Sequence, residues 1–245
     1  MQPNLVHLAN LIIDIGNTRI KSALFEKKEL NDEFVHLNLE EALEFWSKLI
    51  FEQCMVSSVK WSESELNAVL PFEFRILNHD TKLPIRNKYG SPKTLGLDRI
   101  AAAIGAWSMV NQKPVLSIDL GSCITFDLVD QSGAFLGGAI SPGLAMRARA
   151  MNEFTARLPL VKLKNKPKEL IGDSTVSCMQ IGIWSGVDYE IVGQIKAYQE
   201  KYPQIEVFVC GGDAQSFDSL VKDHIFVVPN LVLHGLNAIL NHNVE

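Results

Sequence analysis

Two short turns in the sequence carry residue types that can hold a polyphosphate. The first is Asp14-Ile15-Gly16-Asn17-Thr18 and the second is Asp119-Leu120-Gly121-Ser122. A glycine in a tight turn lets backbone N–H groups approach phosphate oxygens, and a neighbouring Asn, Thr or Ser adds side-chain hydrogen bonds. The aspartate that ends the preceding strand can hold a cation that neutralises phosphate charge. Two such turns facing each other would clamp a triphosphate.

Each turn alone is explained more simply as a hairpin, since a lone Asp-x-Gly is common. However, the turns lie in equivalent segments, 11–25 and 115–129, in which an apolar run meets the turn and the chain returns as an alternating strand. The turns superpose without a gap, from Asp14 on Asp119 to Asn17 on Ser122, at an offset of 105 residues. This repetition favours phosphate binding and predicts a duplicated fold. Neither GxxxxGK[ST] nor GxGxxG, the motifs of other nucleotide sites, occurs in the chain.

A third acidic residue, Asp98, lies in the segment Gly96-Leu97-Asp98-Arg99, where a helix is expected to start. One interpretation is a helix cap, because the helix dipole favours a carboxylate in the first turn. The other interpretation is catalytic. An aspartate can orient a hydroxyl as a base, and the guanidinium after it can bind a carboxylate or a phosphoryl group. The spacing alone favours neither interpretation.

Other polar positions allow two interpretations each. Lys21 could reach a phosphate from the strand after the first turn, or be a solvated lysine. The Gly211-Gly212-Asp213-Ala214 segment follows a buried strand and could approach a nucleotide, or form a strand-to-helix turn capped by Asp213. The lysines at 162, 164, 166 and 168 are typical of a solvated loop, with steering of anionic substrates as the lesser alternative.

Strands and helices alternate along the chain, which predicts an α/β protein of two similar lobes with a ligand cleft between them. The spacing of apolar residues predicts helices over 40–50, 97–110, 144–154, 175–198 and 230–241. A strand is expected at 53–59 and a buried strand at 206–210. The polar connector 111–114 ends in proline, so we expect one lobe of residues 1–112 and another of residues 113–245.

The composition is that of a folded chain without a general affinity for nucleic acid. Its 245 residues include 23 basic and 28 acidic side chains and carry a formal net charge of -5, so any phosphate must be held by local groups. No stretch approaches the roughly 18 apolar residues of a membrane span. No basic residue precedes the first apolar stretch, as one would in a signal peptide. We therefore expect a cytoplasmic protein that binds neither nucleic acid nor membranes.

In this order the motifs resemble those of type III pantothenate kinase, a family in the superfamily of acetate and sugar kinases, heat-shock chaperone ATPases and actin. The resemblance spans almost the whole chain. It rests on the two turns with Lys21, the Tyr89 to Arg99 segment, Gly137-Gly138-Ala139-Ile140-Ser141-Pro142-Gly143, Thr175 and the Gly211 to Ala214 segment. It implies two ribonuclease H-like lobes, each a mixed sheet with flanking helices.

The resemblance also implies ATP-dependent phosphorylation of pantothenate to 4'-phosphopantothenate, the first step of coenzyme A biosynthesis, with Asp98 as the proton acceptor. The implied ATP contacts are Asp14, Ile15, Gly16, Asn17, Thr18, Arg19, Ile20, Lys21 and Ser122. The implied pantothenate contacts are Tyr89, Gly96, Leu97, Asp98, Arg99 and Thr175. Asp119 would bind a monovalent cation, K⁺ or NH₄⁺, and Mg²⁺ would accompany ATP.

Members of the family are homodimers with the pantothenate pocket near the subunit interface, so the resemblance implies that the partner chain supplies Thr175. Ser122 stands where threonine is usual and keeps the hydroxyl, while Cys123 and Ile124 replace commoner small or polar residues. Two alternatives stay open at this point. The turns would also serve another small-molecule kinase of the superfamily, or a nucleotide-binding regulator without catalysis.

Overall fold

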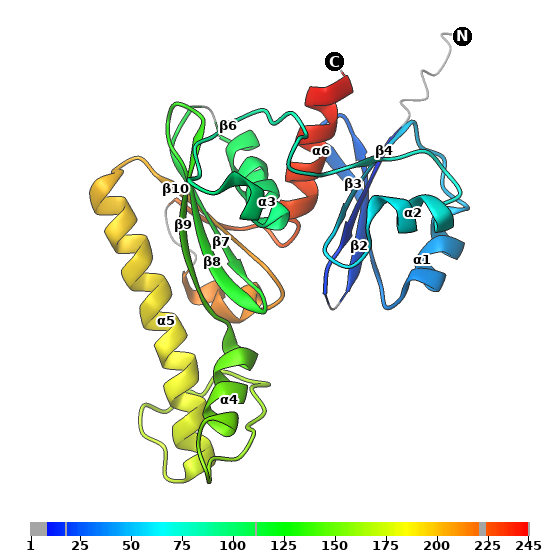
Figure 1. The fold of residues 1–245 in the computed structure, drawn as a ribbon. Helices are drawn as coiled ribbons and strands as arrows, with labels where there is room; N and C mark the ends of the chain where they lie inside the picture. Colours follow the sequence, from blue (N-terminus) through cyan, green and yellow to red (C-terminus); the bar gives the residue numbers. More distant parts are fainter. Residues whose placement is uncertain (1–8, 18, 111, 221–223, 245) are drawn as a thin grey trace, which may run out of the picture. The chain divides into compact units, whose positions relative to one another are not determined.

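The computed structural model describes residues 9–17, 19–110, 112–220 and 224–244. Its contacts divide the chain into two compact units (Figure 1). Unit 1 comprises Met1–Asn111 and Leu231–Glu245, and unit 2 comprises Gln112–Asn230. This division differs from the expected lobes at the C-terminal helix, which joins unit 1 rather than unit 2. No helix in the described ranges is long and apolar enough to cross a membrane.

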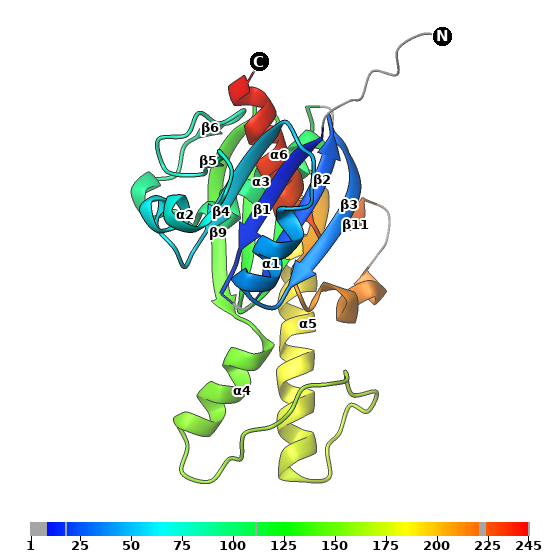
Figure 2. The same ribbon diagram turned by 90° about the vertical axis from the view of Figure 1, so that its right-hand side faces the viewer.

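Unit 1 is built on a five-stranded mixed sheet in the order β3-β2-β1-β4-β5 (Figure 2). Its strands are β1 (Asn10–Ile15), β2 (Ile20–Glu26), β3 (Glu29–His36), β4 (Gln53–Ser58) and β5 (Arg75–Ile76). Strand β1 pairs antiparallel with β2 and parallel with β4. The apolar run at residues 11–13 is fully buried because β1 is the central strand of this sheet.

The helices of unit 1 are α1 (Leu39–Trp46), α2 (Glu63–Val69), α3 (Leu97–Ser108) and α6 (Leu231–Val244), together with the 3₁₀ turn η1 (Pro92–Thr94) and the short strand β6 (Arg86–Asn87). Ser62 and Glu65 form a capping box at the start of α2. Helix α1 ends at Trp46 rather than at the expected residue 50. The amides of Lys48 and Leu49 donate to carbonyls three residues back, which tightens the last turn and ends the α-helix.

Helices α3 and α6 pack so closely that their contact requires glycine. A Cβ on Gly105 of α3 would overlap the carbonyl oxygen of Leu231, and a Cβ on Gly235 of α6 would overlap the carbonyl oxygen of Ala101. The α6 residue Asn237 also donates a hydrogen bond of 2.7 Å to the carbonyl oxygen of Lys27, in the turn between β2 and β3. These contacts hold α6 in unit 1, although α6 follows unit 2 in the sequence.

Unit 2 repeats the strand topology of unit 1. Its strands are β7 (Val115–Leu120), β8 (Cys123–Val129), β9 (Ala134–Pro142), β10 (Glu206–Cys210) and β11 (Ile225–Val227), in the order β11-β10-β7-β8-β9. Strand β7 pairs antiparallel with β8 and parallel with β10, as β1 does with β2 and β4. The predicted α/β fold with a duplicated mixed sheet is therefore confirmed.

The two hairpins nevertheless differ in the length of their turns. Asp14 pairs with Lys21 across the first turn, whereas Asp119 pairs with Thr125 across the second. The second turn is therefore one residue shorter than the first. The predicted offset of 105 residues holds from Asp14 and Asp119 into the turns. It is wrong for the returning strands, where Lys21 corresponds to Thr125 and the offset is 104.

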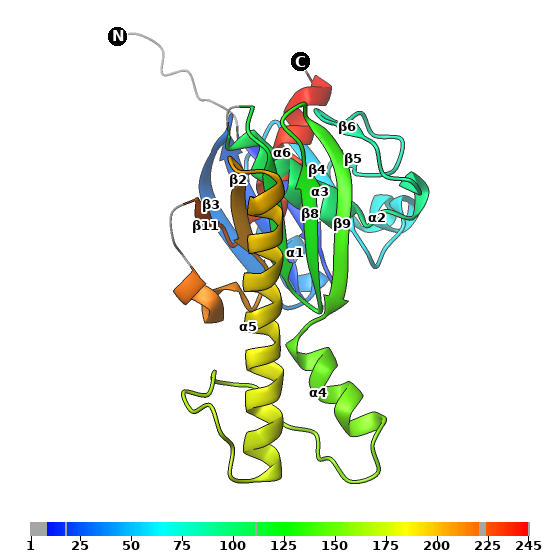
Figure 3. The same cartoon turned by 90° about the vertical axis from the view of Figure 1, so that its left-hand side faces the viewer.

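The helical elements of unit 2 are α4 (Leu144–Glu153), α5 (Thr175–Lys201) and the 3₁₀ segment η2 (Ala214–Leu220). The C-terminal part of α5 packs on the sheet through buried side chains such as Val187 and Ile191. Its N-terminal part runs beyond the end of the sheet, next to α4 (Figures 1 and 3). An ion pair between Arg147 of α4 and Glu190 of α5 joins the two helices. Unit 2 therefore carries a helical projection made of α4, the start of α5 and the loop between them.

We expect Gly235→Ala to lower the free energy of unfolding by about 2 to 3 kcal/mol, because the added methyl group meets backbone atoms that cannot move aside cheaply. A matched control is Gly193→Ala in the middle of α5, where a Cβ meets no atom within 4 Å. The control should gain up to about 1 kcal/mol through helix propensity. Denaturant unfolding of both variants measures the difference, and equal stabilities would refute the close α3–α6 packing.

Candidate active site

The first candidate turn follows β1 in unit 1. Asp14 pairs in register with Lys21 on β2, so the carboxylate and the ammonium lie on the same face of the sheet. The Gly16 amide closes the turn by donating to the Arg19 carbonyl oxygen at 3.1 Å. The side chains of Asn17 and Arg19 are exposed. The turn therefore presents one acidic and several donor groups at the carboxyl end of the central strand.

Two of the residues implied as ATP contacts are core residues. Ile15 ends β1 and Ile20 begins β2, and they are 0% and 4% exposed, respectively, because their side chains pack in the hydrophobic core of unit 1. Only their backbone groups remain for a ligand. Thr18, a third implied contact in this turn, lies outside the described residues.

The second candidate turn joins β7 to β8 in unit 2. Asp119 is half-buried and Ser122 is exposed, and the Gly121 amide donates to the Cys123 carbonyl oxygen at 3.1 Å. Gly143, just before α4, donates from its amide to the Ser122 carbonyl oxygen at 3.1 Å. A Cβ on Gly143 would overlap the Gly121 carbonyl oxygen. The start of α4 is thereby fixed on the turn through backbone contacts.

A glycine loop after β10 packs directly against the second turn. Gly211 has φ of +96°, and a Cβ there would lie 2.5 Å from Oδ1 of Asp119. The Asp213 amide donates to the Leu120 carbonyl oxygen at 3.0 Å, and burial raises the pKa of the Asp213 carboxyl group. Sequence reasoning missed this contact because it depends on the parallel pairing of β7 with β10, which sets Cys210 opposite Asp119.

Asp119 has the chemistry of a ligand for a hard cation, since carboxylate oxygens suit ions that prefer oxygen donors. Among the residues that the structure describes, no group of three His, Cys, Asp or Glu side chains could hold a metal ion. A cation at Asp119 would therefore take its other ligands from backbone carbonyl groups, water or a bound phosphate. Such a mixed set fits a weakly held ion better than a structural metal.

The Gly96 to Arg99 segment forms the first turn of α3, as expected. Gly96 is the N-cap residue, and the Asp98 side chain folds back over it, because a Cβ on Gly96 would lie 2.6 Å from Asp98 Oδ1. The same oxygen accepts a hydrogen bond from the Arg99 amide at 2.9 Å. The Asp98 side chain stays exposed. Asp98 thus satisfies one amide of the helix start and still presents its carboxylate to a ligand, so the two interpretations of this residue are compatible.

Arg99, the residue after Asp98, lies against the ring of Tyr89. The Arg99 side chain is 8% exposed, and its Cζ atom lies 5.7 Å from the centre of the Tyr89 ring, a cation–π distance. Leu97 is half-buried in the same turn. Unit 1 therefore brings together all the residues implied as pantothenate contacts except Thr175.

Thr175 is the first residue of α5, in unit 2, and its side chain is exposed. The helix start is stabilised by a capping box between Ser174 and Ser177. Helix α5 begins at the tip of the helical projection, away from the sheet of its own unit (Figure 3). Thr175 is therefore not brought to the Asp119 turn of the same unit.

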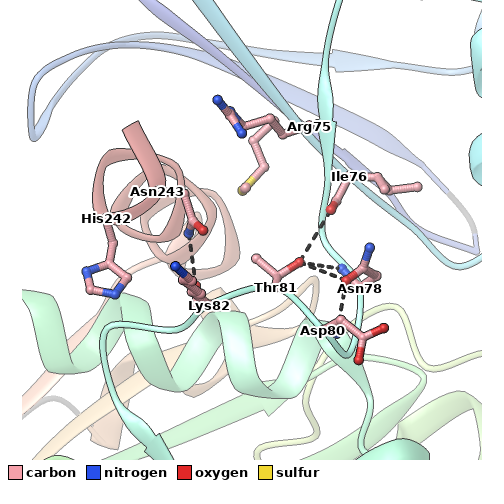
Figure 4. Close-up of a pocket in the computed structure, with 9 residues that line it drawn as sticks. Arg75, Ile76, Asn78, Asp80, Thr81, Lys82, His242 and Asn243 are labelled. Carbon is pink, nitrogen blue, oxygen red and sulfur yellow. Dashed lines mark hydrogen bonds between the residues drawn. The ribbon is translucent and has the colours of Figure 1, made fainter. Parts of the chain in front are cut away.

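A pocket between β5 and α6 is not part of this arrangement. It has a volume of about 550 Å³, and Figure 4 shows hydrogen bonds among some of the polar groups on its wall. Thr81 Oγ1 donates to Asn78 Oδ1 at 3.1 Å, and Asn243 Nδ2 donates to the Lys82 carbonyl oxygen at 2.9 Å. None of the residues implied as ATP or pantothenate contacts lines this pocket.

The family model and the curated relatives agree on one family. A family model described as type III pantothenate kinase matches residues 10–197. A relative named type III pantothenate kinase from Christiangramia forsetii is 42% identical over 240 residues, which cover 96% of this chain and 98% of the relative. A relative of the same name from Bacteroides fragilis (strain YCH46) is 41% identical over 240 residues, with coverage of 96% and 98%.

A solved structure is similar at the level of the fold. The inorganic polyphosphate/ATP-glucomannokinase from Arthrobacter sp. strain KM has a TM-score of 0.50 at 15% identity, and the match covers 97% of this chain and 100% of that chain. At this identity the likeness shows the fold alone. It supports the α/β fold with a duplicated mixed sheet.

Proposed function

The chain belongs to the type III pantothenate kinase family, and from this premise we propose which of its residues hold the substrates and move the proton. As a member of the family it phosphorylates pantothenate with ATP, giving 4'-phosphopantothenate and ADP in the first step of coenzyme A biosynthesis. Phosphoryl transfer has a loose transition state, so it needs charge neutralisation and in-line placement more than a strong base. We therefore assign each residue by what it positions.

Asp98 accepts the proton of the pantothenate hydroxyl group. As the hydroxyl oxygen bonds to the γ-phosphorus, the bond from that phosphorus to the bridging oxygen breaks, and ADP leaves with the electron pair. The observation that carries this assignment is the exposed Asp98 carboxylate, held over Gly96 and anchored by the Arg99 amide. Arg99, next to Tyr89, supplies a guanidinium for the pantothenate carboxylate or the transferred phosphoryl group.

The turns after β1 and β7 bind the phosphates of ATP through backbone amides, with Lys21 and Ser122 adding a cation and a hydroxyl. We assign Mg²⁺ to Asp14 and K⁺ or NH₄⁺ to Asp119. When bound, these ions neutralise phosphate charge. Support comes from the register that sets Asp14 opposite Lys21, and from the glycine loop that packs on Asp119 and leaves no room for a side chain there.

We also propose that the chain works as a cytoplasmic homodimer in which Thr175 contacts the pantothenate of the partner subunit. The helical projection exposes large apolar side chains, among them Phe154 at 82%, Leu170 at 75% and Ile171 at 84%. Such a surface suits an interface between proteins. The position of Thr175 at the tip of the projection suits contact with another chain better than contact with the turn of its own unit.

Mixing two defective variants tests this arrangement. Asp98→Asn and Thr175→Val should each be weakly active alone, because every site then lacks one of the two side chains. If Asp98 and Thr175 come from different subunits, each mixed dimer contains one intact site. Random exchange of subunits should then restore roughly a quarter of the wild-type rate in a coupled assay with pantothenate, ATP and potassium.

As the control, Asp98→Asn alone is taken through the same exchange procedure, and it should gain no activity. If the mixture of the two variants also stays inactive, although mass spectrometry shows mixed dimers, then the two side chains act in the same subunit. The proposed sharing of the site would then be wrong.

A further inference from the structure

The four alternating lysines of the predicted solvated loop line one pocket, and three of them, Lys162, Lys164 and Lys168, are exposed. Lys162, Lys164, Lys166 and Lys168 face a pocket of about 840 Å³ with Ser177 and Gln180 from the first turns of α5. We call residues 162–168 the lysine loop. The loop is part of the helical projection of unit 2, and the chain runs on from it to Thr175 at the start of α5.

Contacts with α5 fix the chain at both ends of this pocket. Gln180 Nε2 donates to the Lys162 carbonyl oxygen at 2.8 Å. At the other end, a Cβ on Gly172 would lie 2.5 Å from the Cys178 amide nitrogen, so the backbone packs directly on the helix. The pocket is therefore formed before any ligand binds, which lowers the entropy cost of holding one.

The charges on the pocket wall differ from those of the whole chain. Lys166 forms an ion pair of 2.5 Å with Asp188, but Lys162, Lys164 and Lys168 have no ion-pair partner among the described residues. Two acidic residues, Glu169 and Asp173, also line the pocket. The pocket is therefore lined by four basic and two acidic side chains, whereas acidic side chains outnumber basic ones, 28 to 23, in the whole chain. The lysine loop is thus a local positive patch on a negative protein.

We propose that the lysine loop attracts the carboxylate of pantothenate and concentrates it beside Thr175. The proposal rests on the proposed contact of Thr175 with pantothenate. A chain of net charge -5 repels an anionic substrate, and a basic patch close to the substrate contact offsets that repulsion locally. Lysine suits this role because its ammonium is a mobile point charge that attracts an anion without fixing its orientation. Arg99 and Tyr89 then position the bound pantothenate for phosphoryl transfer.

The test replaces the three lysines without an ion pair, in the variant Lys162→Gln/Lys164→Gln/Lys168→Gln. The matched control is Lys28→Gln/Lys60→Gln/Lys196→Gln, which removes the same charge from exposed positions elsewhere. At low ionic strength the loop variant should raise KM for pantothenate roughly 3- to 10-fold, with kcat and KM for ATP unchanged. The control should change KM for pantothenate less than 2-fold by the same reasoning. At 1 M salt, where the screening length is about 3 Å, loop variant and wild type should converge.

A neutral substrate makes the test independent of folding defects. Pantothenyl alcohol, in which a hydroxymethyl group replaces the carboxylate, should show the same KM with wild type and loop variant. In wild type alone, added salt should raise KM for pantothenate and leave KM for the alcohol unchanged. Equal effects of the loop and control variants, or a salt response that is the same for both substrates, would overturn the proposal. Absence of any pantothenate-dependent activity in wild type would instead refute the proposed function.

Discussion

Asp98→Asn should lower kcat roughly 10²- to 10⁴-fold and leave the dissociation constant of ATP unchanged. The amide keeps the shape of the side chain and can accept the hydrogen bond from the Arg99 amide, but it cannot take the proton of the substrate hydroxyl. Because Asp98 is exposed, the free energy of unfolding should change by less than about 0.5 kcal/mol. Steady-state kinetics and equilibrium binding of ATP measure the two effects separately.

Asp32→Asn is the matched control, since Asp32 is an exposed aspartate on β3 of the same unit. Its kcat should equal that of wild type. An undiminished kcat in Asp98→Asn would remove Asp98 from the mechanism. If that variant instead lost ATP binding in proportion to kcat, Asp98 would belong to the nucleotide site.

Gly211→Ala should reduce kcat/KM for ATP about 10- to 100-fold. Alanine at φ of +96° is strained by about 1 to 3 kcal/mol, and its methyl group would press on Oδ1 of Asp119. The loop or the carboxylate must then move, which disturbs the turn that we propose for ATP and for the monovalent cation. Kinetics at varied ATP and varied potassium measure the effect, and the potassium concentration needed for half-maximal rate should rise.

The neighbouring Gly212→Ala serves as the control because a Cβ on Gly212 has nothing within 4 Å. Its kcat/KM for ATP should stay within about 3-fold of wild type. Comparable losses in both variants would mean that the loop acts through general flexibility. Wild-type kinetics in Gly211→Ala would mean that the contact with Asp119 has no part in ATP binding.

The features that local sequence decides were predicted closely. The expected helix starts at residues 97, 144 and 175 are confirmed, because a glycine or serine N-cap, Gly96, Gly143 or Ser174, precedes each of them. The two hairpins were predicted from a buried apolar run followed by a glycine turn and an alternating strand. In these segments propensity, turn chemistry and burial agree, so a local pattern suffices.

The features that were missed depend on contacts between distant segments. No local signal shows that α6 returns to unit 1, since that placement rests on the contact of Gly105 with Gly235. The packing of Gly211 on Asp119 depends in the same way on the pairing of β10 with β7. The shorter second turn follows from strand register, which the turn residues alone did not determine. The lysines lie in an exposed loop, as predicted, but the pocket that they line was missed because a charge pattern carries no information about it.

A crystal structure with a non-hydrolysable ATP analogue, potassium and pantothenate is the most direct measurement of the proposed arrangement. We expect a single polyphosphate bound by backbone amides of both turns, after Asp14 and after Asp119. The Asp98 carboxylate should lie within about 3.2 Å of the pantothenate hydroxyl oxygen that faces the γ-phosphorus. Phosphates bound away from either turn, or an Asp98 carboxylate directed away from that hydroxyl, would show that the turns and Asp98 do not form one active site.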